Sequence, residues 1–225
     1  MSGTHDHSRG APVRYRAILF DLDGTLADTI PVCVQAFQRT FRRYAQRDYA
    51  YDEITAMFGP SEEGILQRRL PDRWQAALAT YLAEYERLHA NCPGLFAGLH
   101  PLLARLKRRG VRLGIVTAKG PSSARISARL LGLDAYFDGL EAGSAEGGSK
   151  PERMGRFLAR WRLPVGDVAY VGDSPHDVDA SRAAGVAAVA AAWAPGANAT
   201  ALAARHPDEL FESVSAFDAW LARVT

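Results

Sequence analysis

Three acidic residues near the start of the chain stand directly after a short apolar run. Residues 17–20 read Ala-Ile-Leu-Phe, and Asp21, Asp23 and Asp28 follow them. Like charges gathered at the end of a buried strand destabilise a fold unless a cation or hydrogen-bond donors compensate them. Carboxylate oxygens are the ligands that a hard divalent cation such as Mg²⁺ prefers. The spacing therefore predicts a site in which acids share a cation.

Polar residues also follow two further apolar runs. Thr117 lies near the end of the run at 111–118, and Asp173 ends the run at 168–173. In an open parallel sheet the carboxyl ends of the strands border one crevice, where ligands bind. Lys150 comes just before the helix that leads to the second of these runs, so it would reach the same crevice. Because a lysine and a hydroxyl suit a phosphate group, we expect a phosphate and a divalent cation to share the site.

Six short apolar runs, separated by helical patterns, must position these residues. The runs lie at 16–21, 111–118, 136–143, 168–173, 186–193 and 210–214, the last as an edge strand. Apolar strands that alternate with helices predict a parallel sheet covered on both faces. The predicted fold class is therefore α/β, with a Rossmann-like core.

One long interval breaks this alternation. Residues 28–93 contain no convincing strand, and the apolar residues within 30–46 and 71–90 recur at helical spacing. We predict a small helical cap domain at 28–93, inserted into an α/β core formed by 14–27 and 94–225. Residues 1–13 are expected to form a flexible N-terminal tail. Asp28 is expected to cap the first helix of the cap.

The composition argues against several classes of protein. The net charge of +2 gives no strong attraction to nucleic acid. No stretch approaches the roughly 20 apolar residues that cross a bilayer, and the N-terminus lacks the apolar segment of a signal peptide. The two cysteines, Cys33 and Cys92, have no zinc-binding spacing, which is typical of reduced cytosolic thiols. We expect a cytoplasmic protein that binds neither nucleic acid nor membranes.

Four segments resemble, in order, the four motifs of the haloacid dehalogenase superfamily of phosphohydrolases. They are DLDGTLADT at 21–29, VTAK at 116–119, KP at 150–151 and YVGDSPHDVDASRAAG at 170–185. The resemblance covers nearly the whole chain outside the tail. Within the superfamily the pattern most resembles phosphoglycolate phosphatases, and it implies a helical cap inserted after the first motif.

The resemblance implies a role for each matching residue. Asp21 would attack phosphorus and form an aspartyl-phosphate, while Asp23 would protonate the leaving oxygen and later deprotonate water. The residues implied to bind the substrate phosphate are Asp21, Leu22, Asp23, Thr117, Ala118 and Lys150. The residues implied to hold Mg²⁺ are Asp21, Asp23 through its backbone carbonyl, Asp173, and Asp177 directly or through water.

Other residues are less clearly assigned by the pattern. Lys119 is expected to be a solvent-exposed loop lysine. The loop at 58–66 is either a specificity loop of the cap or an ordinary connection. Arg68 and Arg69 are expected on a solvent-exposed face of the cap, with a contact to an anionic substrate as the alternative.

Three related chemistries fit the residues poorly. Dehalogenases of the superfamily lack the second acid of the first motif, which is present here as Asp23. Phosphonatases need a cap lysine, and residues 28–93 contain none. Sugar-phosphate mutases place a histidine near the start of the cap, where this chain reads IPVCVQAF.

These considerations favour a Mg²⁺-dependent phosphatase that hydrolyses a small phosphomonoester, with phosphoglycolate as the first candidate. The alternatives within the family are inorganic pyrophosphate and nucleotide or sugar phosphates. The alternative from another class is a regulatory protein that binds a phosphorylated ligand without turnover. In each case the expected partner is a small phosphorylated metabolite, and the chain could be a monomer or a homodimer.

Overall fold

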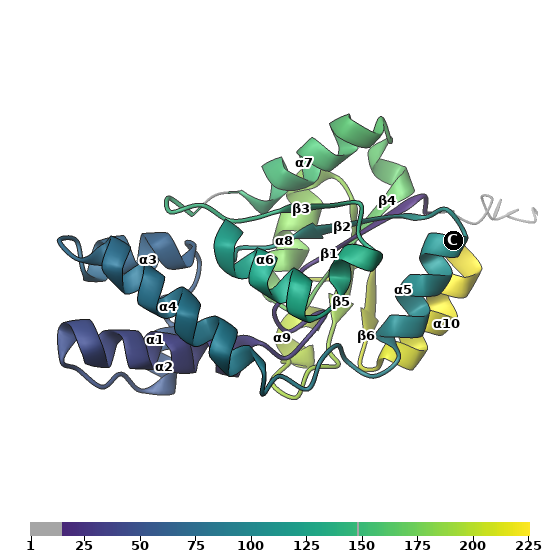
Figure 1. The fold of residues 1–225 in the computed structure, drawn as a ribbon. Helices are drawn as coiled ribbons and strands as arrows, with labels where there is room; N and C mark the ends of the chain where they lie inside the picture. Colours follow the sequence, from purple (N-terminus) through teal and green to yellow (C-terminus); the bar gives the residue numbers. More distant parts are fainter. Residues whose placement is uncertain (1–14, 148) are drawn as a thin grey trace, which may run out of the picture.

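The computed structural model describes residues 15–147 and 149–225 of the chain. Its core is a sheet in the order β3-β2-β1-β4-β5-β6, in which all neighbouring strands are parallel (Figure 1). The strands are β1 (Ala17–Phe20), β2 (Arg112–Val116), β3 (Gly139–Glu141), β4 (Val168–Gly172), β5 (Ala187–Ala191) and β6 (Glu209–Phe211). The α/β prediction is confirmed, and each predicted run contains most or all of one strand. The predicted tail at 1–13 lies outside the described residues.

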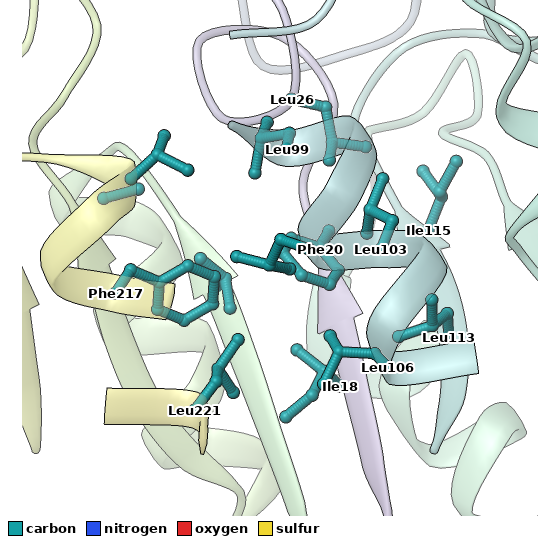
Figure 2. Packing of buried hydrophobic residues seen from close by; sticks show 14 of the residues in the cluster. Ile18, Phe20, Leu26, Leu99, Leu103, Leu106, Leu113, Ile115, Phe217 and Leu221 are labelled. Carbon is teal, nitrogen blue, oxygen red and sulfur yellow. The ribbon is translucent and has the colours of Figure 1, made fainter. Parts of the chain in front are cut away.

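Helices cover both faces of this sheet. Ile18 and Phe20 of β1 belong to one cluster of buried residues, which includes Leu103 and Phe217 (Figure 2). Leu19 belongs to a second cluster with Phe157. The helices of the core are α5 (Leu99–Arg108), α6 (Pro121–Leu130), α7 (Lys150–Trp161), α8 (Pro175–Ala184), α9 (Ala199–Ala203) and α10 (Val214–Val224). Because β1 is buried on both sides, its sequence is apolar throughout instead of alternating.

Four helices between β1 and α5 lie beside the sheet and form a group of their own (Figure 1). They are α1 (Ile30–Ala45), α2 (Tyr51–Thr55), α3 (Glu62–Arg69) and α4 (Trp74–His89). Their apolar faces bury a separate cluster, in which the rings of Phe37 and Tyr81 lie 4.4 Å apart. We call α1–α4 the cap helices, and the division of the chain into cap and core domains remains a proposal.

The chain passes between the core and the cap helices twice, and the two passages lie side by side. Ala27 on the outward passage pairs with Leu95 on the return passage in an antiparallel bridge, and the N–H of Phe96 donates to the carbonyl of Leu26 at 3.0 Å. The prediction that Asp28 caps the first helix is wrong. Thr29 is the residue that precedes α1, and neither residue makes a side-chain capping bond there.

No helix in the described part of the chain is both long enough and apolar enough to span a lipid bilayer.

Candidate active site

A cavity of about 490 Å³ lies between the carboxyl ends of the central strands and the cap helices. Six residues that the sequence analysis selected line it, namely Asp21, Asp23, Thr117, Ala118, Lys150 and Asp173. The cap side is mainly apolar and includes Ile30, Phe37, Phe58, Ile65 and Tyr81. The expected convergence of the strand ends on one crevice is therefore observed.

Lys150, the first residue of α7, links two of the acids. Its Nζ lies 2.8 Å from Asp21 Oδ2 and 2.5 Å from Asp177 Oδ1, and all three side chains are nearly inaccessible to solvent. Burial raises the pKa of Asp21 to about 6, although the neighbouring Lys150 opposes this shift. Burial favours the neutral amine of Lys150, but Asp177 and Asp21 raise its pKa above the usual value. The lysine therefore stays charged and compensates the buried acids.

Asp177 uses both carboxylate oxygens within the protein. Oδ1 accepts from Lys150 and from the Tyr170 hydroxyl at 2.9 Å, while Oδ2 accepts from the N–H of Ser174 at 3.1 Å. The Ser174 hydroxyl accepts in turn from the N–H of Asp177, which makes a capping box at the start of α8. Burial opposes ionisation, but Lys150, Ser174 and Tyr170 lower the pKa of Asp177. Asp177 is therefore well placed to orient Lys150.

Asp173 follows β4 and is held by the turn after β1. The Thr25 hydroxyl donates to Asp173 Oδ1 at 2.9 Å. Gly24 in the same turn has φ of +79°, and a Cβ added there would lie 2.1 Å from Asp173 Oδ2. Glycine is needed at this position because it adopts positive φ without strain and leaves room for the carboxylate.

Three of the acids offer oxygen ligands for a hard cation. Asp21, Asp173 and Asp177 each offer one oxygen, and these oxygens lie within 4.8 Å of one another. Burial, followed by repulsion from Asp21 and Asp177, raises the pKa of Asp173 well above its usual value. A divalent cation among such oxygens would relieve this repulsion. The residues present therefore fit Mg²⁺, with Asp21 and Asp173 better placed as direct ligands than Asp177, whose oxygens are already engaged.

Asp23 stands at the border between the acids and the cap. Its Oδ1 accepts a hydrogen bond from the Thr29 hydroxyl and lies 3.3 Å from Lys119 Nζ. Within residues 15–147 and 149–225, no hydrogen bond or ion pair reaches Oδ2. One oxygen of Asp23 is thus fixed while the other is available to a substrate in the cavity.

The remaining predicted phosphate-binding residues lie close to Asp21. Thr117 directly follows β2, is 1% exposed, and accepts from the N–H of Lys119 at 3.2 Å. The N–H of Leu22 donates to Asp21 Oδ1 at 2.8 Å, so it orients the carboxylate. The carbonyl of Ala118 packs so closely on Gly143 that a Cβ there would lie 1.9 Å from the carbonyl oxygen.

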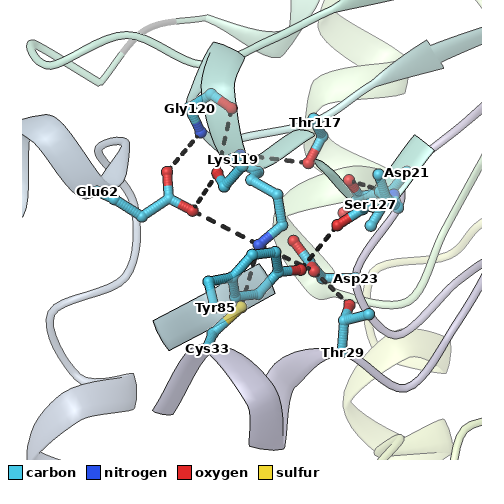
Figure 3. A network of polar contacts seen from close by, with 12 residues as sticks. Asp21, Asp23, Thr29, Cys33, Glu62, Tyr85, Thr117, Lys119, Gly120 and Ser127 are labelled. Carbon is cyan, nitrogen blue, oxygen red and sulfur yellow. Dashed lines mark hydrogen bonds and ion pairs between the residues drawn. The ribbon is translucent and has the colours of Figure 1, made fainter. Parts of the chain in front are cut away.

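Lys119 is buried, so its prediction as a solvent-exposed lysine is wrong. Its side chain is 1% exposed, and Nζ lies 3.0 Å from Cys33 Sγ and 3.5 Å from Glu62 Oε1 (Figure 3). The ammonium also stands 4.4 Å from the ring centroid of Tyr85. Sequence reasoning missed this role because all three of these partners come from the cap helices, which are distant in sequence.

The predicted specificity loop reaches the cavity, whereas the cap arginines do not border it. Phe58, Gly59 and Pro60 line the cavity together with Glu62. Arg68 and Arg69 are exposed and are not among the lining residues. This placement favours the solvent-exposed interpretation of the arginine pair.

Arg153 is a cavity residue that sequence reasoning missed. It is 5% exposed and lies one helical turn after Lys150 on α7, so both face the same way. The sequence contained one signal for this placement, because Lys150 and Arg153 are three residues apart at the start of a predicted helix and would therefore lie on the same face. Arg153 adds a second cation on the core side of the cavity.

Comparisons of the sequence place the chain among hydrolases. Residues 18–191 match the model of a family described as haloacid dehalogenase-like hydrolase. A PpaX protein from Caldanaerobacter subterraneus subsp. tengcongensis is 33% identical over 184 residues, which cover 80% of this chain and 83% of that protein. The tyrosine-protein kinase PtkA of Mycobacterium tuberculosis is 32% identical over 182 residues, or 80% of this chain and 62% of PtkA.

Solved structures agree with this placement. The haloacid dehalogenase-like hydrolase SP0104 from Streptococcus pneumoniae has 27% identity and a TM-score of 0.74, with 92% of this chain and 98% of that chain covered. CbbY from Rhodobacter sphaeroides, solved with phosphate, has a TM-score of 0.75 at 24% identity and covers 88% of this chain and 94% of its own. The similarity to CbbY shows a shared fold.

Proposed function

Because the chain belongs to the haloacid dehalogenase-like hydrolase family and is a phosphatase, we propose that it hydrolyses a small phosphomonoester with Mg²⁺ through an aspartyl-phosphate on Asp21. The observation that supports this most is the placement of Lys150 between Asp21 and Asp177 at the cavity. This placement keeps the carboxylate of Asp21, the proposed nucleophile, next to the ammonium of Lys150, and both side chains are largely shielded from water. When bound, Mg²⁺ would supply positive charge that stabilises the phosphoryl oxygens.

The proposed reaction has two steps. In the first, Asp21 attacks phosphorus, the bond to the leaving oxygen breaks, and Asp23 gives its proton to that oxygen. In the second, Asp23 takes a proton from water, the water oxygen attacks phosphorus, and the bond to Asp21 breaks to release inorganic phosphate. Thr117 and Lys150 would bind the phosphoryl oxygens during both steps.

Phosphoglycolate is the first substrate that we propose, and inorganic pyrophosphate is the second. The size of the cavity suits a small phosphate ester, and cap residues such as Phe37 and Tyr81 line one side of it. Pyrophosphate gains support from the relatives, because the Bacillus velezensis protein named pyrophosphatase PpaX is 28% identical over 204 residues, covering 90% of this chain. The kinase activity named for PtkA has no comparable support from the geometry of the site.

The test is a measurement of phosphate release from phosphoglycolate, pyrophosphate, a sugar phosphate and a nucleoside monophosphate, with and without Mg²⁺. We expect Asp21→Asn to reduce turnover at least 1,000-fold, because the amide keeps the shape but cannot attack phosphorus. Asp179→Asn is the matched control, since Asp179 pairs with Arg182 and Arg205 away from the cavity. Wild-type turnover in a folded Asp21→Asn variant, or full activity in excess chelator, would contradict the proposal.

A further inference from the structure

One ammonium group connects the cap helices to the proposed acid–base residue. Lys119 comes from the loop after β2, and its Nζ contacts Cys33 of α1, Glu62 of α3 and the ring of Tyr85 of α4. The same atom lies 3.3 Å from Asp23 Oδ1. We call Lys119 and its partners Asp23, Cys33, Glu62 and Tyr85 the Lys119 network (Figure 3).

Glu62 is the main contribution of the cap to this network. Besides Lys119, its carboxylate accepts from the N–H of Gly120 at 2.6 Å and from the Ser123 hydroxyl at 2.6 Å. Gly120 and Ser123 lie at the start of α6, where free N–H groups and the helix dipole favour a negative charge. A carboxylate of the cap is therefore bound by a helix of the core in a place that water hardly reaches.

The network forms only when the cap helices lie against the core. If they moved away, Lys119 would lose Cys33, Glu62 and Tyr85 together, and Glu62 would lose its partners on α6. Burial opposes the charge on Lys119, but the surrounding groups, led by Asp23, together raise its pKa well above the usual value, so the ammonium stays charged. A buried charge without its partner is costly, so these contacts favour the position of the cap seen in the structure.

The network also determines how Asp23 is presented to the cavity. Thr29 and Lys119 both hold Oδ1, and Thr29 lies on the passage between core and cap. Without Lys119, only the Thr29 hydroxyl would hold this carboxylate. The carboxylate could then rotate, and Oδ2 would no longer be directed at the leaving oxygen.

We propose that Lys119 is a positioning residue that holds Asp23 in place and that depends on Glu62 to keep the cap helices against the core. The part that concerns Asp23 rests on the proposed function, whereas the part that concerns the cap does not. Two measurements therefore test the two parts separately.

The position of the cap can be followed through a cysteine. Cys33 is 5% exposed and contacts Lys119 Nζ, and burial raises the pKa of its thiol to about 12, so it should react very slowly with iodoacetamide. In a Cys92→Ser background Cys33 is the only thiol of the chain. We expect Glu62→Gln to accelerate alkylation of Cys33 at least tenfold, as followed by mass spectrometry.

Glu86→Gln is the matched control for this measurement. Glu86 on α4 pairs with Arg129 on α6, so it also joins cap to core, but both side chains are more than half exposed. An exposed pair contributes little, so the alkylation rate should stay within a factor of two. If Glu62→Gln left the rate unchanged, or if Glu86→Gln accelerated it equally, the proposed role of Glu62 would be wrong.

The role of Lys119 at Asp23 can be read from the leaving group. p-Nitrophenolate leaves without a proton, whereas an alkoxide needs one from Asp23. In Lys119→Met we expect kcat for an alkyl phosphate to fall at least tenfold more than kcat for p-nitrophenyl phosphate. Lys119→Met leaves the carboxylates of Glu62 and Asp23 without their cation, which could unfold the protein. The double variant Lys119→Met/Glu62→Gln removes the charge of Glu62 as well, and the same comparison of substrates is made with it.

Lys107→Met is the control, since Lys107 is a surface lysine paired with Asp138. It should leave kcat for both substrates unchanged. Equal losses on the two substrates in folded Lys119 variants would overturn the positioning role. If the wild-type protein hydrolysed neither substrate, the proposed function would fail instead, and the alkylation of Cys33 would still test the cap contact.

Discussion

Lys150 is the residue on which both the fold and the chemistry of the site depend. It is the cation paired with Asp21 and Asp177, and removal of one partner of a buried pair typically costs about 3–5 kcal/mol. Lys150→Met should therefore lower the free energy of unfolding by several kcal/mol and depress turnover of every substrate alike. Urea unfolding and the four-substrate panel measure these effects. A change in substrate ranking without loss of stability would contradict this assignment.

Gly24 tests how closely the turn after β1 approaches the acids. Gly24→Ala places a Cβ where the Asp173 carboxylate now lies, so we expect the Mg²⁺ concentration for half-maximal activity to rise at least tenfold. Gly110→Ala is the control, because Gly110 has a similar φ of +76° but nothing within 4 Å of an added Cβ. Both variants bear the strain of positive φ. Equal metal dependence in the two variants would remove the steric argument.

Because the pKa of Asp21 is raised, the stability of the metal-free protein should fall as the pH rises. In the folded protein the pKa of Asp21 is about 6, above the usual value of 3.8, so the folded state binds this proton more tightly than the unfolded state does. The resulting contribution to the free energy of unfolding is fully present below pH 4 and is lost as the pH rises through 6. Mg²⁺ should therefore raise Tm more at pH 7.5 than at pH 5. Calorimetry with Mg²⁺ at one hundred times its Kd should show about 2.7 kcal/mol of stabilisation at the higher pH. An equal effect at both values would contradict the prediction.

At the residue level the sequence identified the acids and Lys150, but it missed the burial of Lys119, whose partners come largely from the cap helices. Asp21, Asp23 and Asp173 follow strands, and a parallel sheet brings strand ends together whatever the details of packing. Lys119 has the same local sequence signal as an exposed loop lysine. Its burial depends on Cys33, Glu62 and Tyr85, whose positions follow from how four helices pack onto the core.

Among the elements, the strands were predicted well because each is a short apolar run between polar turns. The helices α2 and α3 span only five and eight residues, which give too little hydrophobic periodicity to mark a helix end in the sequence. The capping role expected for Asp28 failed for a related reason. The preference of an aspartate for the N-cap position has a smaller effect than the backbone conformation of the passage from core to cap, which determines where α1 begins.

Residues 58–61, the part of the predicted specificity loop that precedes α3, should determine which phosphate is accepted. Phe58 lines the cavity, so Phe58→Ala should shift kcat/KM for a sugar phosphate relative to phosphoglycolate about tenfold, the usual scale for lost apolar contact in a pocket. Tyr51→Ala is the control, because Tyr51 is an exposed aromatic residue of the cap outside the cavity. If Phe58→Ala lowered all substrates equally, the loop would have a structural role only.

At the scale of the whole molecule, the apolar cluster of the cap helices and the apolar clusters of the sheet lie on either side of the polar residues of the site. The cap helices bury their own cluster, and the sheet is covered by others. The boundary between them contains the cavity and the Lys119 network. A cavity between the cap helices and the core is a site where a small rotation of the cap helices would change the access of a substrate to the reacting atoms.

The scarcity of lysine in this chain has a practical consequence. Of its three lysines, Lys107 is 43% exposed at the side chain, while the side chains of Lys119 and Lys150 are 1% and 5% exposed. An acylating label aimed at lysine side chains should therefore modify Lys107 first and leave the other two almost untouched. The fraction of molecules labelled at Lys119 or Lys150 would measure how many had opened at these positions while the reagent was present. The label on Lys107 of the same chain would serve as the surface reference.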